Sequence, residues 1–281
     1  MFTSYIRILR AAADGKSAAA AKAPAARLRK GKAMHTYSIY FSPTGGTKKA
    51  ADILAGCFEQ AETVDITVHA AGPEFSGEDI CIISAPSFGG RVPGPAAERI
   101  ARLKGKGAKA VLVAVYGNRA YDDTLLELKN LAIQAGFRPI AAVAAVAEHS
   151  IMRQFGTGRP DESDCQELRR FGERIREKAA SGTAELWVPG SQPYREYNGV
   201  PTKPTGGAGC LSCGRCMKEC PTGAIEAKNL RAVNKEKCIS CMRCVSVCPQ
   251  GARKVSPLLL KAAALKMKKD CGGRKKNELY L

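Results

Sequence analysis

Eight of the twelve cysteines of this 281-residue chain are crowded into residues 210–248. They form two runs, CLSCGRCMKECP from Cys210 and CISCMRCVSVCP from Cys238, which share the pattern C-x-S-C-x-R-C-x₃-C-P at an offset of 28 residues. Three cysteines spaced by two residues let one tight loop wrap its thiolates around a [4Fe–4S] cluster. A pair of Cys₄ zinc sites is the alternative, but such sites usually show two C-x₂-C pairs with a longer spacer between them. The spacing therefore favours iron–sulfur clusters.

The fourth cysteine of each run precedes a proline and points away from its own loop. In proteins with two such clusters, this cysteine ligates the other cluster. The predicted ligands of the first cluster are Cys210, Cys213, Cys216 and Cys248, and those of the second are Cys238, Cys241, Cys244 and Cys220. Few sizeable aliphatic side chains lie within the repeat, so the clusters should be its core, and the apo form should be unfolded.

A second candidate site is the segment FSPTGGTKK, which begins at Phe41 between a predicted strand and a predicted helix. Backbone N–H groups and the helix dipole bind phosphate at such a position. The segment lacks the Walker A order and the dinucleotide G-x-G-x-x-G order. Its hydroxyls and glycines suit a monophosphate instead. Lys48 and Lys49 fall in the first helical turn, where the dipole disfavours cations, and a bound phosphate would relieve that conflict.

Strands and helices alternate from Met34 onward. The predicted strands are 35–42, 63–68, 79–86, 108–117 and 138–148, and the predicted helices are 47–61, 94–104, 123–136 and 161–181. Because several strands are apolar on both faces, the pattern predicts an α/β fold with a doubly wound parallel sheet. Such sheets bind ligands outside the carboxyl ends of their strands.

The chain is predicted to have five parts. They are a basic, disordered extension (1–33), the sheet domain (34–181), a Gly/Pro-rich linker (182–209), a small α+β cluster domain (210–252) and a basic tail with a short helix and a loose end (253–281). The extension has the Arg-rich composition of an organellar transit peptide, but we favour translation starting at Met34. The sequence has neither a secretory signal nor an apolar run long enough to predict a transmembrane segment.

The formal net charge of +18 is concentrated at the two ends of the chain. Residues 1–33 hold eight Lys or Arg and one Asp, and residues 252–281 hold nine Lys or Arg and two acidic residues. The ends thus supply 14 of the 18 charges. Basic ends of this kind are more often solvated than bound to nucleic acid, so we expect no specific nucleic-acid function.

Both candidate sites resemble known families. Residues 205–252 resemble the bacterial-type two-[4Fe–4S] ferredoxins, and the glycine segment resembles the phosphate loop of flavodoxins, [ST]-x-T-G-x-T. The flavodoxin resemblance implies that FMN phosphate is bound by Ser42, Thr44, Gly45, Gly46 and Thr47. It also implies that two loops flank the isoalloxazine ring: Pro86, Ser87, Phe88, Gly89 and Gly90, and then Tyr116, Gly117, Asn118 and Tyr121. The aromatic opposite Phe88 is Tyr116 or Tyr121. The alternative is that Tyr116 only ends a core strand and the sheet holds no cofactor.

Residues 34–252 together resemble the fused flavodoxin–ferredoxin proteins called EFR1-type ferredoxins. The loops APSFGGRVP and VYGNRAYDD and the segments EHSIMRQFGTGRPDESD and VPGSQPY carry this resemblance. It implies a cytoplasmic electron-transfer protein that passes single electrons between two [4Fe–4S] clusters and FMN, on behalf of redox protein partners. The alternative is an FMN-dependent reductase of a small molecule that uses its own clusters as electron inlet. A redox-sensitive binding protein acting through basic tails is a third interpretation.

The remaining reactive side chains are predicted to be structural. No Ser/His/Asp or Cys/His set is arranged for nucleophilic catalysis, and we predict no catalytic residue. Cys81 is expected in the core, and Cys271 in the tail is the one candidate reactive thiol. His149 is expected to cap or pack rather than contact the flavin. Arg215 and Arg243 recur in the cluster loops, where they either favour the reduced cluster or are solvated.

Overall fold

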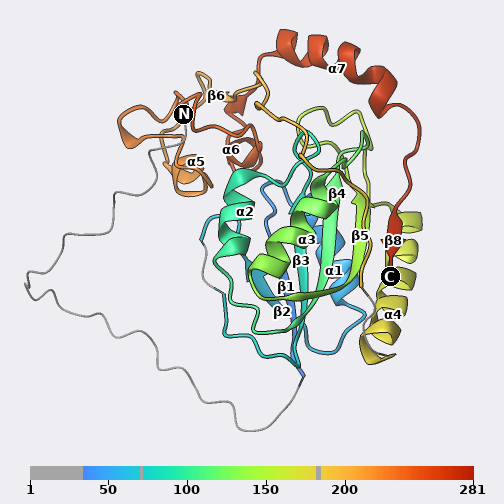
Figure 1. Ribbon diagram of the computed structural model, residues 1–281. Coiled ribbons are helices and arrows are strands. Elements are labelled where there is room, and N and C mark those ends of the chain that lie inside the picture. Colours follow the sequence, from blue (N-terminus) through green and yellow to red (C-terminus); the bar gives the residue numbers. More distant parts are fainter. Residues whose placement is uncertain (1–33, 70–71, 182–184) are drawn as a thin grey trace, which may run out of the picture. The chain divides into compact units, whose positions relative to one another are not determined.

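Six strands form the main sheet of the computed structural model, which describes residues 34–69, 72–181 and 185–281 (Figure 1). The five parallel strands are β1 Thr36–Tyr40, β2 Glu62–Asp65, β3 Ile80–Pro86, β4 Lys109–Tyr116 and β5 Arg138–Val146. Their order is β2-β1-β3-β4-β5, which is the flavodoxin-like doubly wound order. The predicted fold class is therefore confirmed. The predicted extension, residues 1–33, lies outside the described residues.

Helices cover both faces of this sheet. α1 (Gly46–Ala55) and α4 (Glu162–Ser181) lie on one face, and α2 (Gly94–Ala101) and α3 (Thr124–Gln134) lie on the other (Figure 1). The strands β3, β4 and β5 are buried on both faces, as near-continuous apolar runs require. Helix α1 is shorter than predicted, because the chain turns at Gly56.

The C-terminal segment is not the loose end that the sequence predicted. Helix α7 (Pro257–Cys271) is followed by β8 (Glu278–Tyr280), which pairs antiparallel with β5. The prediction was wrong because three residues are too few to show a strand period, and the pairing depends on an edge that only the folded sheet offers. Cys271 is only 2% exposed, so the expectation of a reactive tail thiol is wrong too.

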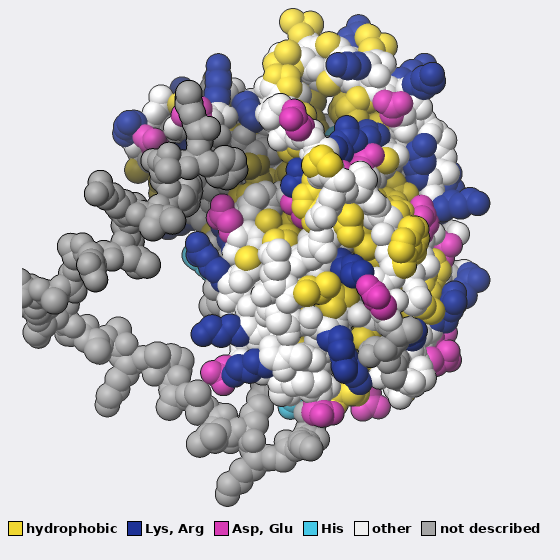
Figure 2. Space-filling view, viewed as in Figure 1, with side chains coloured by type: hydrophobic (Ala, Val, Ile, Leu, Met, Phe, Trp, Pro, Cys, Tyr) yellow, Lys and Arg dark blue, Asp and Glu magenta, His cyan; other side chains and the backbone are white. Residues whose placement is uncertain are grey.

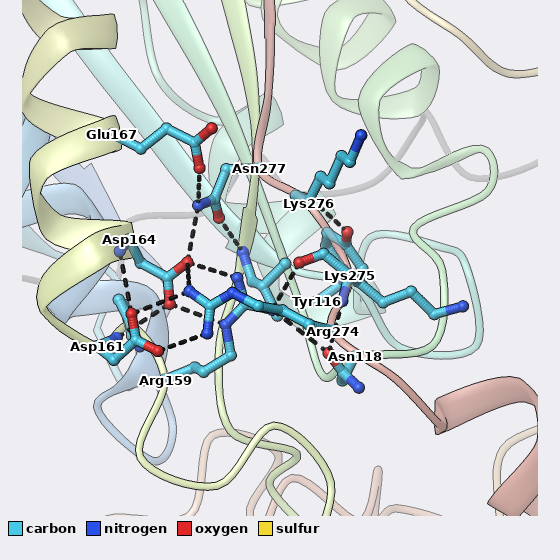
Figure 3. Close-up of polar contacts among 12 residues, drawn as sticks. Tyr116, Asn118, Arg159, Asp161, Asp164, Glu167, Arg274, Lys275, Lys276 and Asn277 are labelled. Atoms are coloured by element: carbon cyan, nitrogen blue, oxygen red, sulfur yellow. Dashed lines mark hydrogen bonds and ion pairs between the residues drawn. The ribbon is translucent and has the colours of Figure 1, made fainter.

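A buried ion pair holds this segment to the sheet (Figure 3). The guanidinium of Arg159 donates to Asp164, with Nε 2.8 Å from Oδ2, and both side chains are at most 5% exposed. Asn277 donates to the same carboxylate at 3.0 Å and accepts from the backbone N–H of Val146 at 2.8 Å. Arg159 also donates to the carbonyl of Lys275 at 2.8 Å. The segment before β8 is thus part of the sheet domain's polar interior.

The predicted linker is largely packed rather than free. Leu186 and Val188 are buried in the core that lies under α2 and α3. The carboxylate of Asp123 accepts from the backbone N–H groups of Ser191 at 2.9 Å and Arg195 at 2.7 Å. A Gly/Pro-rich composition therefore reflects irregular backbone here, not freedom of movement.

The small α+β domain is built from two short helices and a two-stranded sheet. β6 (Thr205–Gly206) pairs antiparallel with β7 (Arg253–Lys254), and this pair brackets α5 (Arg215–Lys218), the 3₁₀ turn Ala227–Asn229 and α6 (Arg243–Ser246). We call residues 205–254 the cluster domain. The prediction of an α+β domain is confirmed, and β6 extends it into the predicted linker. Among the described residues, no helix has the length and apolar character needed to cross a bilayer.

Candidate functional site between the sheet domain and the cluster domain

The two cysteine runs fold into equivalent loops. Ser212 and Ser240 have positive φ angles of 54° and 55°, and the residues after the second cysteine, Gly214 and Met242, have 74° and 61°. Non-glycine residues rarely adopt this left-handed conformation. Its recurrence in both runs curls each loop around its cysteines and leads directly into α5 or α6.

Backbone N–H groups point at the cysteine sulfurs. The N–H groups of Ala224 and Ala252, at the same place in each run, donate to Sγ of Cys220 and Cys248 at 3.3 Å. Hydrogen bonds of this kind stabilise a thiolate, and metal ligation needs thiolates. Among the described residues, no group of three or more His, Cys, Asp or Glu side chains is placed to hold a single metal ion.

The sulfur atoms of the second predicted cluster lie close enough to interact. Burial raises the pKa of the Cys241 thiol to about 12, and repulsion from Cys244, Cys220 and Cys238 adds to the rise. A hydrogen bond from the Arg243 backbone acts in the opposite direction and lowers this pKa. Cys220, from the first run, is thus among the groups whose charge acts on Cys241. Binding iron would remove the protons from these thiols.

A cavity of about 600 Å³ lies at the carboxyl ends of β1, β3 and β4. Its volume is in the range of cofactor sites. Nine of the fourteen predicted FMN-binding residues line it: Thr44, Gly46, Thr47, Pro86, Ser87, Phe88, Gly89, Tyr116 and Gly117. Three loops that are far apart in the sequence therefore meet at the switch point of the sheet, where doubly wound folds bind ligands.

The other five predicted residues lie outside the cavity lining: Ser42, Gly45, Gly90, Asn118 and Tyr121. The amide of Asn118 donates to the carbonyls of Cys271 and Gly273, and the Tyr121 hydroxyl lies 2.7 Å from that of Tyr280. Both side chains thus serve the C-terminal segment, so the site proposed below omits them. Gly90 packs closely on Asp122: a Cβ added at Gly90 would lie 2.2 Å from a carboxylate oxygen of Asp122.

The predicted phosphate loop wraps around the start of α1. Ser42 Oγ accepts from the backbone N–H of Lys48 at 2.9 Å, which draws the loop around the start of α1. Gly45 has a φ of 93°, and an added Cβ there would meet only open space. The sequence led us to expect a bound phosphate near Lys48 and Lys49, but both lysines have partners within the protein. Lys48 pairs with Asp52, and Lys49 donates to the carbonyl of Pro160. The N–H groups at the start of α1 therefore supply the positive potential.

Tyr197 lines the cavity, and sequence reasoning gave it no role in the site. Its ring packs directly on Gly89, where an added Cβ would lie 2.1 Å from Cδ2 of the ring. The predicted glycine pair therefore allows close approach by a tyrosine of the chain. Together with Phe88 and Tyr116 it gives the cavity three aromatic walls. The available signal was the run of aromatics in the segment after α4.

His149 both caps a turn and borders the cavity. Its Nδ1 accepts from the backbone N–H groups of Ile151 and Met152, each at 3.2 Å. Burial lowers its pKa to about 4, so the ring is neutral near pH 7. The predicted capping role is confirmed, and the ring is also part of the cavity lining.

The cluster domain and α7 complete the cavity. Cys241, a predicted ligand of the second cluster, lines it next to Ser240. Leu259, Ala263 and Lys266 of α7 line it as well. Arg243 joins the two domains at this point, because its Nη1 donates to the carbonyl of Pro43 in the phosphate loop at 3.3 Å and its Nε donates to Glu219 at 3.1 Å.

One family model matches part of the chain. Residues 209–253 match the family model of the 4Fe-4S dicluster domain. The match covers all eight cysteines of the repeat and confirms the iron–sulfur prediction over the zinc alternative. No curated protein matches the chain.

Solved flavodoxin structures are similar to about half of the chain. The Streptococcus pneumonia TIGR4 flavodoxin is 17% identical, with a TM-score of 0.38, over 52% of this chain and 99% of its own. A WrbA-like flavodoxin from Agrobacterium tumefaciens is 16% identical, with a TM-score of 0.37, over 53% and 98%. The two-electron reduced flavodoxin of Megasphaera elsdenii is 18% identical, with a TM-score of 0.33, over 50% and 98%. The strand order of the sheet carries the fold assignment without them.

Proposed function

We propose that this protein passes single electrons between two [4Fe–4S] clusters and an FMN bound in the cavity of the sheet domain. One observation carries the proposal: Cys241 lines the same cavity as the phosphate loop and Phe88. The clusters supply one-electron carriers, and FMN supplies a centre that takes electrons singly and holds a pair. This combination is that of the fused flavodoxin–ferredoxin proteins, and we propose that the chain is one of them.

The chain's own residues have distinct tasks in this proposal. The start of α1 binds the FMN phosphate, while Phe88, Tyr116 and Tyr197 hold the ring. The cysteines bind the clusters in the cross-tied pairing predicted above. Cys241 is 8% exposed and faces the cavity, whereas Cys213 is an exposed ligand of the first cluster. Electrons therefore enter at Cys213 and leave toward the flavin at Cys241.

The electron balance needs an external one-electron donor, which is a reduced redox protein in our proposal. Two oxidations of that donor reduce one FMN by two electrons, with protons taken from solvent. Leu211, which precedes Cys213 by two residues, is 71% exposed and is available for contact with the donor.

The alternative function is an FMN-dependent reductase with its own small-molecule substrate. One observation favours it: Lys266 of α7 borders the cavity and would suit an anionic substrate. Many turnovers with a small oxidant, measured without any acceptor protein, would support the reductase. Reoxidation only by an added protein would support the carrier.

The first experiment is cofactor analysis of protein purified without oxygen. We expect about eight iron, about eight sulfide and about one FMN per chain. Full iron with no FMN, even after soaking in FMN, would contradict the proposal. Zinc in place of iron, in cells supplied with iron, would contradict the cluster assignment.

A charge placed in the phosphate loop should separate FMN from riboflavin. Thr44→Asp puts a carboxylate where the proposal has the phosphate, so FMN affinity should fall about tenfold or more, which is about 1.4 kcal/mol. Riboflavin has no phosphate, and its affinity should change by less than about twofold. Flavin fluorescence quenching measures both. Thr63→Asp, on the exposed edge of β2, is the matched control. Equal losses for both flavins would place the phosphate elsewhere.

A further inference from the structure

The carbonyl of Pro43, in the predicted phosphate loop, accepts hydrogen bonds from the cluster domain. Arg243 Nη1 donates to it at 3.3 Å, and Ser246 Oγ donates to it at 3.4 Å. Pro43 is buried and lines the cavity, whereas Thr44 and Gly45, which follow it, are exposed. Residues of α6 thus contact the loop directly before the exposed positions where the proposed function places the FMN phosphate.

The position of Arg243 depends on both cysteine runs. Its Nε donates to a carboxylate oxygen of Glu219 at 3.1 Å, and its Nη2 donates to the same oxygen. Glu219 directly precedes Cys220 in the first run, and Arg243 directly precedes Cys244 in the second. α5 and α6 have four residues each, and helices this short are not stable alone. The arginine therefore reaches Pro43 only while the cysteines hold both runs in place.

A second contact connects the first cysteine run to the same loop. Arg99 of α2 donates from Nη2 to the carbonyl of Pro221, the last residue of that run, at 2.6 Å. Its Nη1 donates to the carbonyls of Ile66, at 3.1 Å, and Thr67. The hydroxyl of Thr67 accepts from the backbone N–H of Ser42 at 2.8 Å. Arg99 therefore bridges the cluster domain and the residue that holds the start of the phosphate loop.

The cluster domain also supplies part of the cavity wall. Ile239, Ser240 and Cys241 line the cavity. Ser240 Oγ donates at 3.4 Å to the carbonyl of Val200, which lines the cavity as well. Without a folded cluster domain, this side of the cavity would be open and the phosphate loop would lose its contact with Arg243. A flavin site complete within the sheet domain is the alternative, and it predicts the same flavin affinity whether or not the cluster domain is folded.

We propose that the loaded cluster domain is part of the FMN site, with Arg243 and Arg99 as positioning residues of the phosphate loop, so that FMN binds tightly only when the clusters are present. The inference rests on the function proposed above and links the loading of its two kinds of cofactor. Coupling between two binding sites is reciprocal, so bound FMN favours the iron-loaded state by the same factor. A chain without its clusters then carries little flavin, and flavin cut off from its electron source does not accumulate.

The first test compares FMN binding by the full chain with its clusters and by the same chain after a chelator has removed the iron, using equilibrium dialysis without oxygen. We expect the iron-free chain to bind FMN at least about tenfold more weakly, which is within the range of coupling between sites. Amide hydrogen exchange in β3, β4 and β5 checks that the sheet domain stays folded. Equal affinities with and without iron would overturn the inference and leave the proposed function in place. Iron-loaded protein that binds no FMN would remove both.

A variant isolates the arginine contact while the clusters remain. Arg243→Met removes a donor to Pro43, so at full iron its FMN affinity should fall about fivefold, as for the loss of one hydrogen bond, and its riboflavin affinity by less than about twofold. Arg215→Met is the matched control, because Arg215 is exposed and has the same place in the first run, 28 residues earlier. It should leave the affinity for both flavins unchanged.

The iron content of each variant decides how its result is interpreted. Full iron with unchanged FMN affinity in Arg243→Met would overturn the inference. If Arg243→Met loses iron, Arg99→Met decides instead, since Arg99 lies outside the cysteine runs. Weaker FMN binding by Arg99→Met at full iron supports the inference, and unchanged binding overturns it.

Discussion

Removing the iron should unfold the cluster domain and leave the sheet domain folded. Within residues 205–254, few apolar side chains are buried, chiefly those of Ile225, Met242, Ala224 and Ala252. A domain of this size does not reach stability on so small a core, and metal binding then provides folding free energy. Amide hydrogen exchange, with and without an iron chelator, should show protection lost across the cluster domain and kept in β3, β4 and β5.

A matched pair of variants tests the same expectation without a chelator. Cys238→Ser with Cys241→Ser removes two predicted ligands, and should abolish protection in the cluster domain. Cys57→Ser with Cys165→Ser removes two half-buried thiols of the sheet domain and should not. Protection that persists in the iron-free domain would mean that its polypeptide folds on its own, and that the clusters are not its core.

Replacing Asp164 with asparagine should destabilise the sheet domain by about 3–5 kcal/mol. The substitution leaves the guanidinium of Arg159 buried without its carboxylate and weakens the hold on Asn277. Trp187, the only tryptophan, lies edge-on to Tyr280 of β8 at 5.9 Å, so its fluorescence should report release of that strand. Urea unfolding should show the loss, with β8 leaving at lower urea than in the wild type.

The control lies on the same helix. Glu162 faces Arg169 at 3.6 Å with both side chains more than half exposed, so Glu162→Gln should cost at most about 1 kcal/mol. Burial alone would raise the pKa of the Asp164 carboxyl. Hydrogen bonds from Arg159, the Asp161 backbone and Asn277 lower it by more, so the pKa lies below the ordinary 3.8. Stability from this carboxylate is present above pH 3.8 and is lost as pH falls through the folded-state pKa. The gap between wild type and Asp164→Asn should therefore narrow in acid. A gap as small as the control's would mean that the pair contributes nothing.

Long periodic segments made the sheet predictable, and local spacing made the clusters predictable. The near-continuous apolar run of β4 and the alternation of strands and helices determine the architecture, while eight cysteines at fixed intervals specify their own ligand chemistry. The glycine loop could be placed between strand and helix because the three are contiguous in the sequence, and Thr44, Gly46 and Thr47 line the cavity. In each case the signal lies within a few adjacent residues.

What the sequence could not predict depends on contacts across the folded chain. Tyr197 enters the cavity only because Gly89 leaves room for its ring, and these residues are far apart in sequence. The Tyr121 side chain lies against β8 and not in the cavity lining, because the hydroxyl of Tyr280 provides a hydrogen-bond partner for its own hydroxyl. In the sequence, Arg253 is one of many basic residues near the end of the chain, and only the structure shows that its side chain is buried.

The far end of the chain mixes apolar and basic side chains at the surface. Leu258 and Leu265 of α7 are 80% and 68% exposed, and Figure 2 shows hydrophobic and basic side chains together at that end of the face. Two of the nine basic residues counted in residues 252–281 have structural tasks: Arg253 is buried, and Arg274 pairs with Asp161 at 2.6 Å. Net charge therefore overstates how much of this region is free to attract a partner.

The pairing of β8 with β5 changes how the two domains are connected. The chain leaves the sheet after α4, forms the cluster domain and returns to complete the same sheet. The cluster domain is thus an insertion that is connected to the sheet domain at both ends, not a domain attached by a single linker. A carrier on one tether must find its acceptor by diffusion, and its transfer rate falls as the solvent becomes more viscous. A doubly anchored carrier makes no such search, so the internal transfer here should be insensitive to viscosity.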